Sequence, residues 1–196
     1  MKRTLVWFRR DLRISDHEPL LRATQRGLVV PIFVFDRALL HHPETGSARV
    51  AFLLAALHAL DADLRSLGGR LIVRLGDPVQ VLPDLVEAVG AEGIYAHTDC
   101  ERIYGRVRDA RLNQALAQRG LRIRWFEPAA SAATLMPYPQ YRELWYRDMG
   151  QPLVPTPQQV QVPPVIASDP LPSLKHLGHR ADAKPIPPAS TAAARE

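Results

Sequence analysis

Four charged side chains follow the first apolar segment of the chain. Residues Thr4–Phe8 favour a β-strand, and Arg9, Arg10, Asp11 and Arg13 come directly after them. An arginine guanidinium forms planar, charge-assisted hydrogen bonds, so we expect Arg9 to bind the anionic or carbonyl edge of a ligand, with a surface arginine as the alternative. Asp11 is a second candidate contact, and we expect it above all to order the loop, by pairing with Arg13 or accepting backbone N–H groups.

A second polar segment, residues 97–109, follows another short apolar stretch. It begins with His97, Thr98 and Asp99, whose side chains donate and accept hydrogen bonds. The two polar segments form one site only if the fold places them side by side. Whether it does depends on the order of the strands that precede them.

Apolar periodicity predicts five strands that alternate with four helices. The strands are expected at residues 4–8, 28–35, 71–75, 93–96 and 121–126, and the helices at 17–26, 48–67, 78–89 and 103–118. Strands separated by helices run in the same direction, so the expected fold class is α/β, a doubly wound, Rossmann-like, five-stranded parallel sheet. Residues 36–46 are predicted to form a polar loop.

The expected strand order is 3-2-1-4-5. In this order the first and fourth strands are neighbours, and the loops after them line one crevice at the carboxyl edge of the sheet, where open α/β sheets bind ligands. The sequence has neither Gly-x-Gly-x-x-Gly after the first strand nor Gly-x-x-x-x-Gly-Lys-Ser/Thr, so the usual glycine-rich phosphate loops are missing.

The composition changes after residue 130. Twelve of the 18 prolines lie in Pro137–Pro188, so we expect a domain at residues 1–130 and a proline-rich linker or wrapping segment at 131–196. Aromatic residues interrupt this segment on what is predicted to be one short helix, namely Tyr138, Tyr141, Trp145 and Tyr146.

Composition also limits the kinds of site. Cys100 is the single cysteine, which excludes an internal disulfide and a cysteine-cluster metal centre, and His41-His42 has no further ligands nearby in sequence. No apolar run reaches membrane-spanning length, so we expect a cytoplasmic protein without membrane contact. The net charge of +5 is mild, and no spacing places a nucleophile beside a His-Asp partner.

Two stretches resemble a known family. Leu5–Arg13 followed by Asp16-His17, together with Tyr104–Asp109, is similar to the amino-terminal α/β domain of the DNA photolyase/cryptochrome family. The resemblance spans about residues 4–126.

This resemblance implies a domain that binds a light-harvesting antenna chromophore: FMN, a deazaflavin or methenyltetrahydrofolate. In the family, excitation energy passes to FAD in a helical domain, which repairs pyrimidine dimers in DNA by electron transfer. The chain has no counterpart of that domain, so we expect no catalytic residue and no lyase activity from the chain alone. The expected partner is a helical FAD-binding domain or subunit, covalently joined or separate, and DNA is contacted only through it.

The resemblance also suggests residue roles. Chromophore binding is expected at Arg9, Asp11, Val34, Phe35, Arg49, Thr98, Asp99 and Tyr104. Phe33, Val34 and Phe35 form a stacking wall in this hypothesis, with core packing as the favoured alternative for Phe33. Thr98 and Asp99 bind a flavin or pterin edge, or else belong to a helix-capping loop.

Three arginines and one aspartate have the remaining expected roles. Arg49 opens a helix, where arginine opposes the helix dipole, and this placement favours a ligand or phosphate role. Arg106, Arg108 and Asp109 are expected to contact the helical domain, with a solvated helix face as the alternative.

Two other functions are open on the sequence. One is a nucleotide-binding stress or signalling module of Rossmann-like fold, which ATP would stabilise thermally without any chromophore effect. The other is a pure interaction subunit whose proline-rich segment wraps a helical partner.

Overall fold

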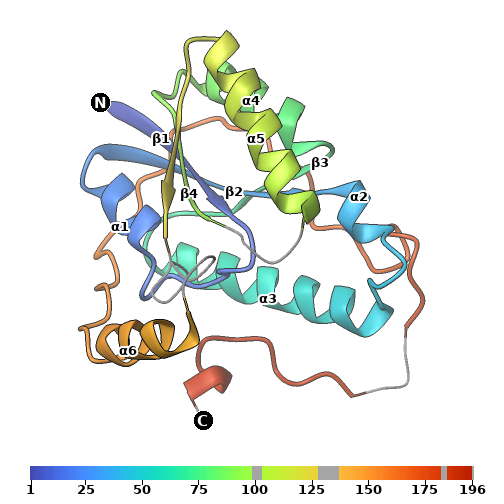
Figure 1. Cartoon of the computed structure of the whole chain (residues 1–196). Helices are drawn as coiled ribbons and strands as arrows, with labels where there is room; N and C mark the ends of the chain where they lie inside the picture. Colours follow the sequence, from blue (N-terminus) through green and yellow to red (C-terminus); the bar gives the residue numbers. More distant parts are fainter. Residues whose placement is uncertain (99–102, 128–136, 182–184, 196) are drawn as a thin grey trace.

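A parallel β-sheet lies between two layers of helices in the computed structural model of the protein, which describes residues 1–98, 103–127, 137–181 and 185–195 (Figure 1). The strands are β1 (Lys2–Phe8), β2 (Gly27–Phe35), β3 (Ile72–Leu75), β4 (Ile94–His97) and β5 (Ile123–Phe126). They pair in the order β3-β2-β1-β4-β5, and every pair is parallel. The predicted fold class and strand order are confirmed.

The helices follow the predicted alternation, with one addition. They are α1 (Glu18–Thr24), α2 (Arg37–Leu40), α3 (Ser47–Ser66), α4 (Pro78–Val89), α5 (Ile103–Gln118) and α6 (Tyr138–Met149), and Ala193–Arg195 forms a 3₁₀ turn. The expectation of a loop throughout residues 36–46 was wrong, because Asp36 accepts a hydrogen bond from the Ala38 N–H and so caps the one-turn helix α2.

Alternate residues of the central strands face opposite layers. Leu5 and Trp7 of β1 pack with α4 and α5, whereas Val6 and Phe8 pack with α1 and α3. Since both faces are covered, β1 and β2 are apolar along nearly their whole length, as expected for central strands of a parallel sheet.

Helix α5 buries a different set of residues from the one expected. The apolar spacing predicts Val107, Leu112, Ala115 and Leu116 on the inner face. Leu112 and Leu116 are buried there, but Val107 is 53% exposed and Arg108 is buried in its place. Arg108 lies one turn before Leu112 on the same helix face, and carboxylates at the sheet edge stabilise its charge there.

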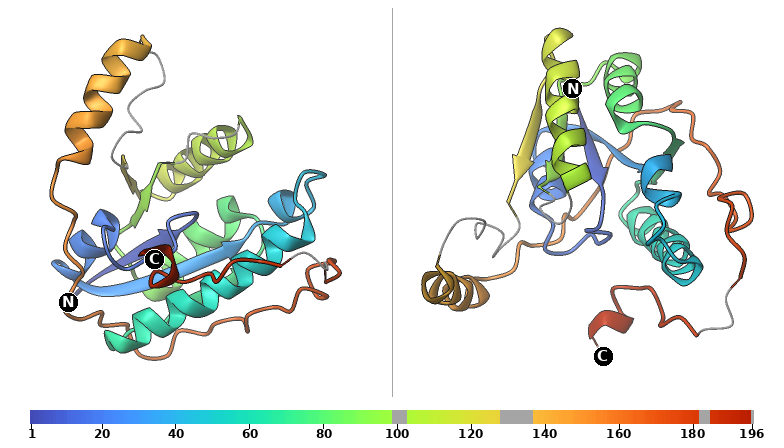
Figure 2. Two further views of the ribbon diagram at one scale, coloured as in Figure 1. Left: turned by 90° about the horizontal axis from the view of Figure 1, so that it is seen from below. Right: turned by 45° about the vertical axis from the view of Figure 1, so that its right-hand side comes forward.

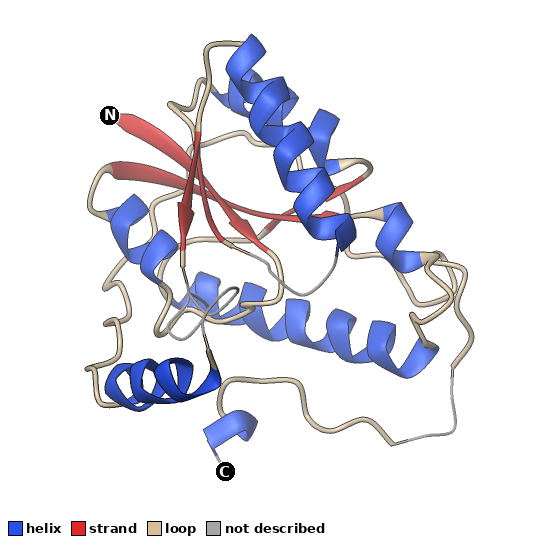
Figure 3. Ribbon diagram, viewed as in Figure 1, coloured by secondary structure: helices blue, strands red, loops and turns tan. Residues whose placement is uncertain are grey.

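Residues 151–181, which we call the strap, run largely without secondary structure along the outside of the domain (Figure 3). Val160, Ile166 and Leu177 of the strap are buried in the two core clusters. The strap is also tied by backbone hydrogen bonds, for example from the Val160 N–H to Leu67 O at 2.8 Å.

The strap covers the outer edge of β3. The Val73 N–H donates to Ser168 Oγ at 2.9 Å, the Leu75 N–H donates to Asp169 Oδ2 at 3.3 Å, and the Asp169 N–H donates to Val73 O. An open edge strand offers unpaired donors and acceptors to other chains, and these contacts remove that liability.

None of the helices in the described part of the chain combines the length and hydropathy that a membrane span requires.

Candidate ligand-binding site

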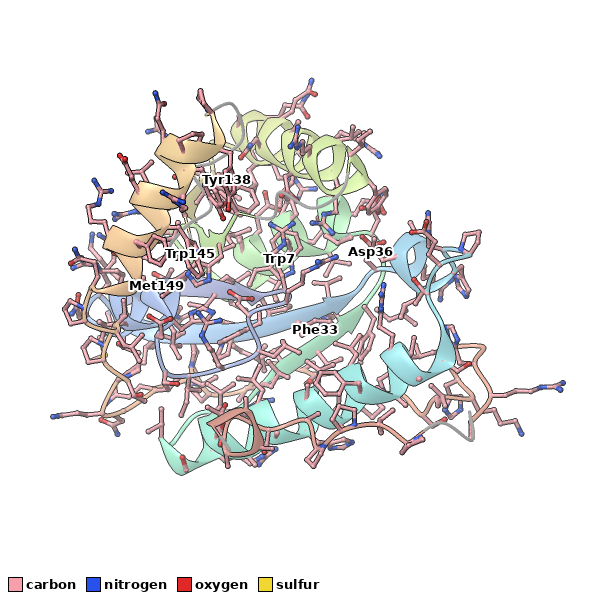
Figure 4. The ribbon with its side chains drawn as sticks, turned by 60° about the horizontal axis from the view of Figure 1, so that its bottom comes forward. Trp7, Phe33, Asp36, Tyr138, Trp145 and Met149 are labelled. Carbon is pink, nitrogen blue, oxygen red and sulfur yellow. The ribbon has the colours of Figure 1, made fainter. Side chains whose placement is uncertain are left out.

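A cavity of about 540 Å³ opens at the carboxyl edge of the sheet. The ends of β1 and β2 form one wall, and α2 and the first half of α3 form the other. The apolar part of its lining is Trp7, Phe8, Leu12, Phe33, Val34, Phe35, Leu39, Leu40, Val50, Phe52, Leu53, Ala56 and Pro78; the polar part is Arg9, Arg10, Asp36, Thr45, Arg49 and Arg108. Figure 4 labels Trp7, Phe33 and Asp36 at this edge.

The adjacency of β1 and β4 brings the two polar segments together. Leu5 pairs with Ile94 and Val6 with Tyr95, so both strands end at the same edge. Arg9 Nη1, beyond the end of β1, donates a hydrogen bond of 3.1 Å to the carbonyl oxygen of His97, the last residue of β4.

Two arginines and two aspartates form a buried ionic network beside the cavity. Arg9 Nη2 lies 3.0 Å from Asp109 Oδ2, and Arg108 Nη2 lies 3.0 Å from Asp109 Oδ1. Arg108 Nη1 also lies 3.4 Å from Asp36 Oδ2. Buried charges are tolerated when they are paired in this way, and two cations balance two anions within this group of four.

Aromatic rings stack against the same arginines. The Arg9 guanidinium lies 4.6 Å from the ring centroid of Trp7 and 5.5 Å from that of Trp125, and Arg108 lies 5.0 Å from the ring of Trp7. Cation–π contacts of this kind fix the planes of the guanidinium groups, so Arg9 and Arg108 are held rigidly at the cavity wall.

Asp36 is fully engaged by the protein itself. Its Oδ1 accepts hydrogen bonds from the Ala38 N–H and the Tyr104 hydroxyl, and its Oδ2 accepts from the same hydroxyl and from Arg108. Burial and, after it, the hydrogen bond to Asp36 raise the pKa of Tyr104, because an ionised phenol would face a carboxylate. Asp36 therefore positions Tyr104 and Arg108 around the site.

Asp11 links three elements behind Arg9. Its Oδ1 accepts the Arg9 backbone N–H at 2.8 Å, and its Oδ2 lies 2.5 Å from His97 Nδ1 and 2.8 Å from His17 Nε2. Burial disfavours the ionised carboxylate, but the adjacent imidazoles of His17 and His97 outweigh that effect and hold the pKa of Asp11 well below its usual range. A charged Asp11 thus fixes the loop that carries Arg9.

The side chains of Asp11, His17 and His97 also lie close enough together to suggest a metal site, with ligand atoms within 4.8 Å of one another. The hydrogen bonds argue against this use. The Leu20 N–H donates to His17 Nδ1, so Nδ1 keeps its lone pair and Nε2 of the neutral ring carries the proton. A protonated Nε2 is not a ligand, and here it faces Asp11 Oδ2, although its N–H is not well aimed at that oxygen.

The structure places the expected chromophore contacts in two groups. Arg9, Val34, Phe35 and Arg49 line the cavity, and the Arg49 guanidinium forms no ion pair within the described residues. Those away from the lining are Asp11, which holds the Arg9 loop; Thr98, whose N–H donates to Phe126 O; and Tyr104, which binds Asp36. Asp99 lies outside the described residues.

The three residues expected to contact a partner domain differ in their exposure to solvent. Arg106 is exposed on α5, whereas the side chains of Arg108 and Asp109 are 5% and 15% exposed and point into the ionic network. Arg13, expected to pair with Asp11, instead pairs with Asp16 at 3.1 Å.

Sequence reasoning missed several residues of this edge. Asp36 carried a signal, because it is a lone aspartate directly after a buried strand, and such positions reach the carboxyl edge. His17 carried a weaker one: it stands at the start of the helix predicted at residues 17–26, and its Nδ1 caps α1 by accepting the Leu20 N–H. Trp7 had none, since its strand position predicts core packing equally well.

These features define the class of protein: a doubly wound α/β domain with a cavity at the carboxyl edge of its sheet, lined by aromatic and aliphatic side chains and by arginines. The sequence model of the DNA photolyase family matches residues 4–135. The chain therefore belongs to the DNA photolyase family.

Individual relatives agree. The chain is 33% identical to the deoxyribodipyrimidine photo-lyase of Synechococcus sp. strain PCC 6301, over 96% of the chain but only 43% of that protein. It is 35% identical to an uncharacterized 31.6 kDa protein of Synechococcus sp. strain PCC 6716, over 89% of the chain and 66% of the relative. The chain thus spans less than half of the photolyase and about two thirds of the smaller relative.

Solved structures share the fold. A Synechocystis sp. PCC6803 cryptochrome superposes with a TM-score of 0.77 at 24% identity, covering 90% of this chain and 40% of the cryptochrome. A class III photolyase from Agrobacterium tumefaciens superposes with a TM-score of 0.69 at 28% identity, covering 89% of this chain and 37% of that one.

Proposed function

We propose that this protein is the light-harvesting unit of a photolyase-type system and binds an antenna chromophore in the cavity at the carboxyl edge of the sheet. The main support for this proposal is the cavity. It has a volume of about 540 Å³, and Phe33, Phe35, Leu53 and several arginines line it. Pockets of this size hold one ligand of drug-like dimensions. Membership of the DNA photolyase family supports a role in light-dependent DNA repair.

The residues present fit a planar heteroaromatic ligand with an anionic group. Aromatic and aliphatic side chains offer a surface for the ring. The acid at the cavity, Asp36, is already engaged, while Arg49 stands exposed in the first turn of α3 and lacks an ion pair among the described residues. The helix begins at Gly46 without a side-chain cap, so backbone N–H groups also favour an anion there.

FMN, a deazaflavin and methenyltetrahydrofolate all combine such a ring with a negative charge. When bound, the chromophore supplies absorption of blue or near-ultraviolet light. The chain's own residues bind and orient it: Arg9 is fixed by Asp109 and Trp7, and Arg49 neutralises the anionic group. The apolar wall excludes water from the ring.

The energy acceptor in this proposal is FAD in a helical domain or subunit that lies outside this chain. The relatives support it, because the deoxyribodipyrimidine photo-lyase of Synechococcus sp. continues well beyond the matched part. The archaeal photolyase from Sulfolobus tokodaii was solved with two FAD molecules, which implied a novel light-harvesting cofactor in that protein. DNA is reached through that partner, and a reducing cytoplasm is the compartment we propose.

The test is titration of the purified chain with FMN, followed by absorbance and calorimetry. We expect saturable binding at one site, and Arg49→Gln should weaken it by about tenfold, as expected when a charge-assisted hydrogen bond to phosphate is lost. Arg37→Gln, an exposed arginine on α2 that does not line the cavity, is the matched control and should leave the affinity unchanged. If FMN, a deazaflavin and methenyltetrahydrofolate all fail to bind, the proposal is wrong.

Addition of ATP tests the alternative function, a nucleotide-binding signalling module. Thermal stabilisation by ATP, with no response to any of the three pigments, would support that alternative.

A further inference from the structure

Trp7 is a residue that a light-harvesting site would be expected to avoid. Its side chain lines the cavity and is only 2% exposed, so the indole is held firmly beside the space for the ligand. Indole is the most electron-rich of the aromatic side chains, as its strong attraction for cations shows. A pigment that has absorbed blue light is a strong one-electron oxidant, so an indole beside it is a potential quencher.

Electron transfer from this indole would dissipate the absorbed energy. Trp7 would lose one electron to the excited ligand and become a radical cation, and return of the same electron would restore both without consuming another reactant. Trp125 extends the route, because its ring centroid lies 6.3 Å from that of Trp7. The Trp125 indole N–H donates to Asn113 Oδ1 in an exposed hydrogen bond, so the positive charge could move from the cavity wall toward solvent.

Two cations lie over the Trp7 ring and oppose the loss of an electron. The Cζ atoms of Arg9 and Arg108 lie 4.6 Å and 5.0 Å from its ring centroid, and Arg9 Cζ is also 5.5 Å from that of Trp125. A positive charge on either indole would be repelled at short range in a buried site, where Coulomb interactions are strong. The cation–π attraction also favours the neutral indole, because oxidation removes the electron density that attracts the cations.

The carboxylates of the ionic network bind the edges of the guanidinium groups. Asp109 accepts hydrogen bonds from Nε and Nη2 of Arg108 and from Nη2 of Arg9, and Asp36 accepts from Nη1 of Arg108. Such bonds lie in the guanidinium plane and leave its faces to the ring. Arg9 comes from the loop after β1 and Arg108 from α5, which lies on the opposite side of the sheet from α3 (Figure 2). Two separate elements thus supply cations to one indole.

We propose that Arg9, together with Arg108, protects the excited state of the pigment by making Trp7 difficult to oxidise. The indole then serves as an apolar wall of the cavity, and the absorbed energy is kept for transfer. This inference rests on the proposed function for the identity of the ligand. It gives Arg9 a second role besides binding, which it performs through its neighbour Trp7.

The fluorescence lifetime of bound FMN tests this role, measured with the chain in excess so that nearly all FMN is bound. Trp7→Phe should leave the lifetime unchanged, because the protected indole does not quench. Arg9→Gln should shorten the lifetime at least about tenfold, since a unit charge within a few ångströms of the indole is lost. Arg9→Lys keeps a cation and should restore most of the lifetime.

Two double variants identify the electron donor. In Arg9→Gln/Trp7→Phe the long lifetime should return, because the quencher is missing. In Arg9→Gln/Trp125→Phe it should stay short, since Trp125 does not line the cavity and only carries the charge onward. Trp125→Phe removes the same indole group as Trp7→Phe and is therefore the matched control. If Arg9→Gln does not fold, the comparison of Trp7→Phe with the unchanged chain decides alone.

Four outcomes would overturn the proposal: a longer lifetime in Trp7→Phe than in the unchanged chain; an unchanged lifetime in Arg9→Gln; equal shortening by Arg9→Gln with and without Trp7; or the same short lifetime in Arg9→Lys. Calorimetric titration separates this test from the proposed function. Absence of saturable pigment binding contradicts the proposed function, whereas saturable binding with a lifetime already limited by Trp7 contradicts this inference alone.

Discussion

Asp11 shows how much one carboxylate does at this site. One oxygen accepts the backbone N–H of Arg9. The other contacts two imidazoles, that of His17 at the start of α1 and that of His97 at the end of β4. Arg9 in turn reaches the His97 carbonyl and Asp109, so the position of the cavity arginine depends on a residue that does not line the cavity. Asp11 is therefore a positioning residue.

The stability of the fold should depend on the ionisation of Asp11. Because its folded-state pKa is depressed, the ionised form stabilises the fold above the unfolded-state pKa of about 3.9, and this contribution is lost as the pH falls through the folded value. Asp11→Asn should cost about 2 kcal/mol at pH 7, in the range for hydrogen bonds to charged groups, and remove this part of the acid dependence. Urea unfolding between pH 2 and about 7 measures both effects. Glu143→Gln, at an exposed residue of α6, should reproduce neither.

His17 has two roles that two substitutions can separate. Asparagine reproduces the position of Nδ1, so His17→Asn should keep the cap on the Leu20 N–H and lose the contact with Asp11. Glutamine reproduces the position of Nε2, so His17→Gln should keep Asp11 and lose the cap. Each should destabilise the fold by about 1 kcal/mol. The pH dependence of unfolding distinguishes them, since His17→Asn alone should reduce the acid-dependent loss; identical profiles would contradict the assigned tautomer.

At the scale of elements, the sequence predicted the framework well because periodicity reports burial. The apolar runs at β1 and β2, and the ends of α4 and α5, followed directly from it. Periodicity did not predict α2, because one capped turn is too short to show a periodic pattern. It also placed Val107 on the inner face of α5, where the structure has Arg108. The inner position of Arg108 depends on Asp36 and Asp109, and only one of these is near it in sequence.

The strap also shows what the sequence could not predict. Its proline content predicted an extended segment, but not which residues contact the domain. Val160 is fully buried, next to Gly69, where an added Cβ would lie 2.8 Å from Val160 Cγ1. A side chain at position 69 would thus displace the strap. The residues that dock the strap are few and irregularly spaced, so no pattern identifies them in advance.

Two valines of the strap test whether it belongs to the fold. Val160→Ala should cost about 2 kcal/mol in urea unfolding, because it removes two buried methyl groups. Val165→Ala, where the side chain is 99% exposed, should change stability by less than about 0.5 kcal/mol. Equal, small effects of the two substitutions would show that the strap is a loosely attached linker.

At the scale of the whole molecule, the cavity and the exposed helix α6 lie in one polypeptide that covers 43% of a photolyase relative. The cavity lies at the carboxyl edge of the sheet, and none of the described side chains of α6 is fully buried. In the proposed light-harvesting role, the cavity supplies the pigment site and the energy acceptor lies outside this chain.

The last prediction concerns what the chain does alone. Repair of a pyrimidine dimer requires a pocket that admits flipped-out bases beside a redox cofactor. The cavity of about 540 Å³ is of the size that holds one drug-sized ligand, and a redox cofactor bound there would occupy it. The chain saturated with FMN and illuminated should therefore leave dimers intact in an oligonucleotide, as measured by chromatography. A chimera of this chain followed by the unmatched remainder of the Synechococcus sp. deoxyribodipyrimidine photo-lyase should repair them. Repair by the chain and FMN alone would mean that the cavity is itself a reaction site, and the light-harvesting proposal would have to be abandoned.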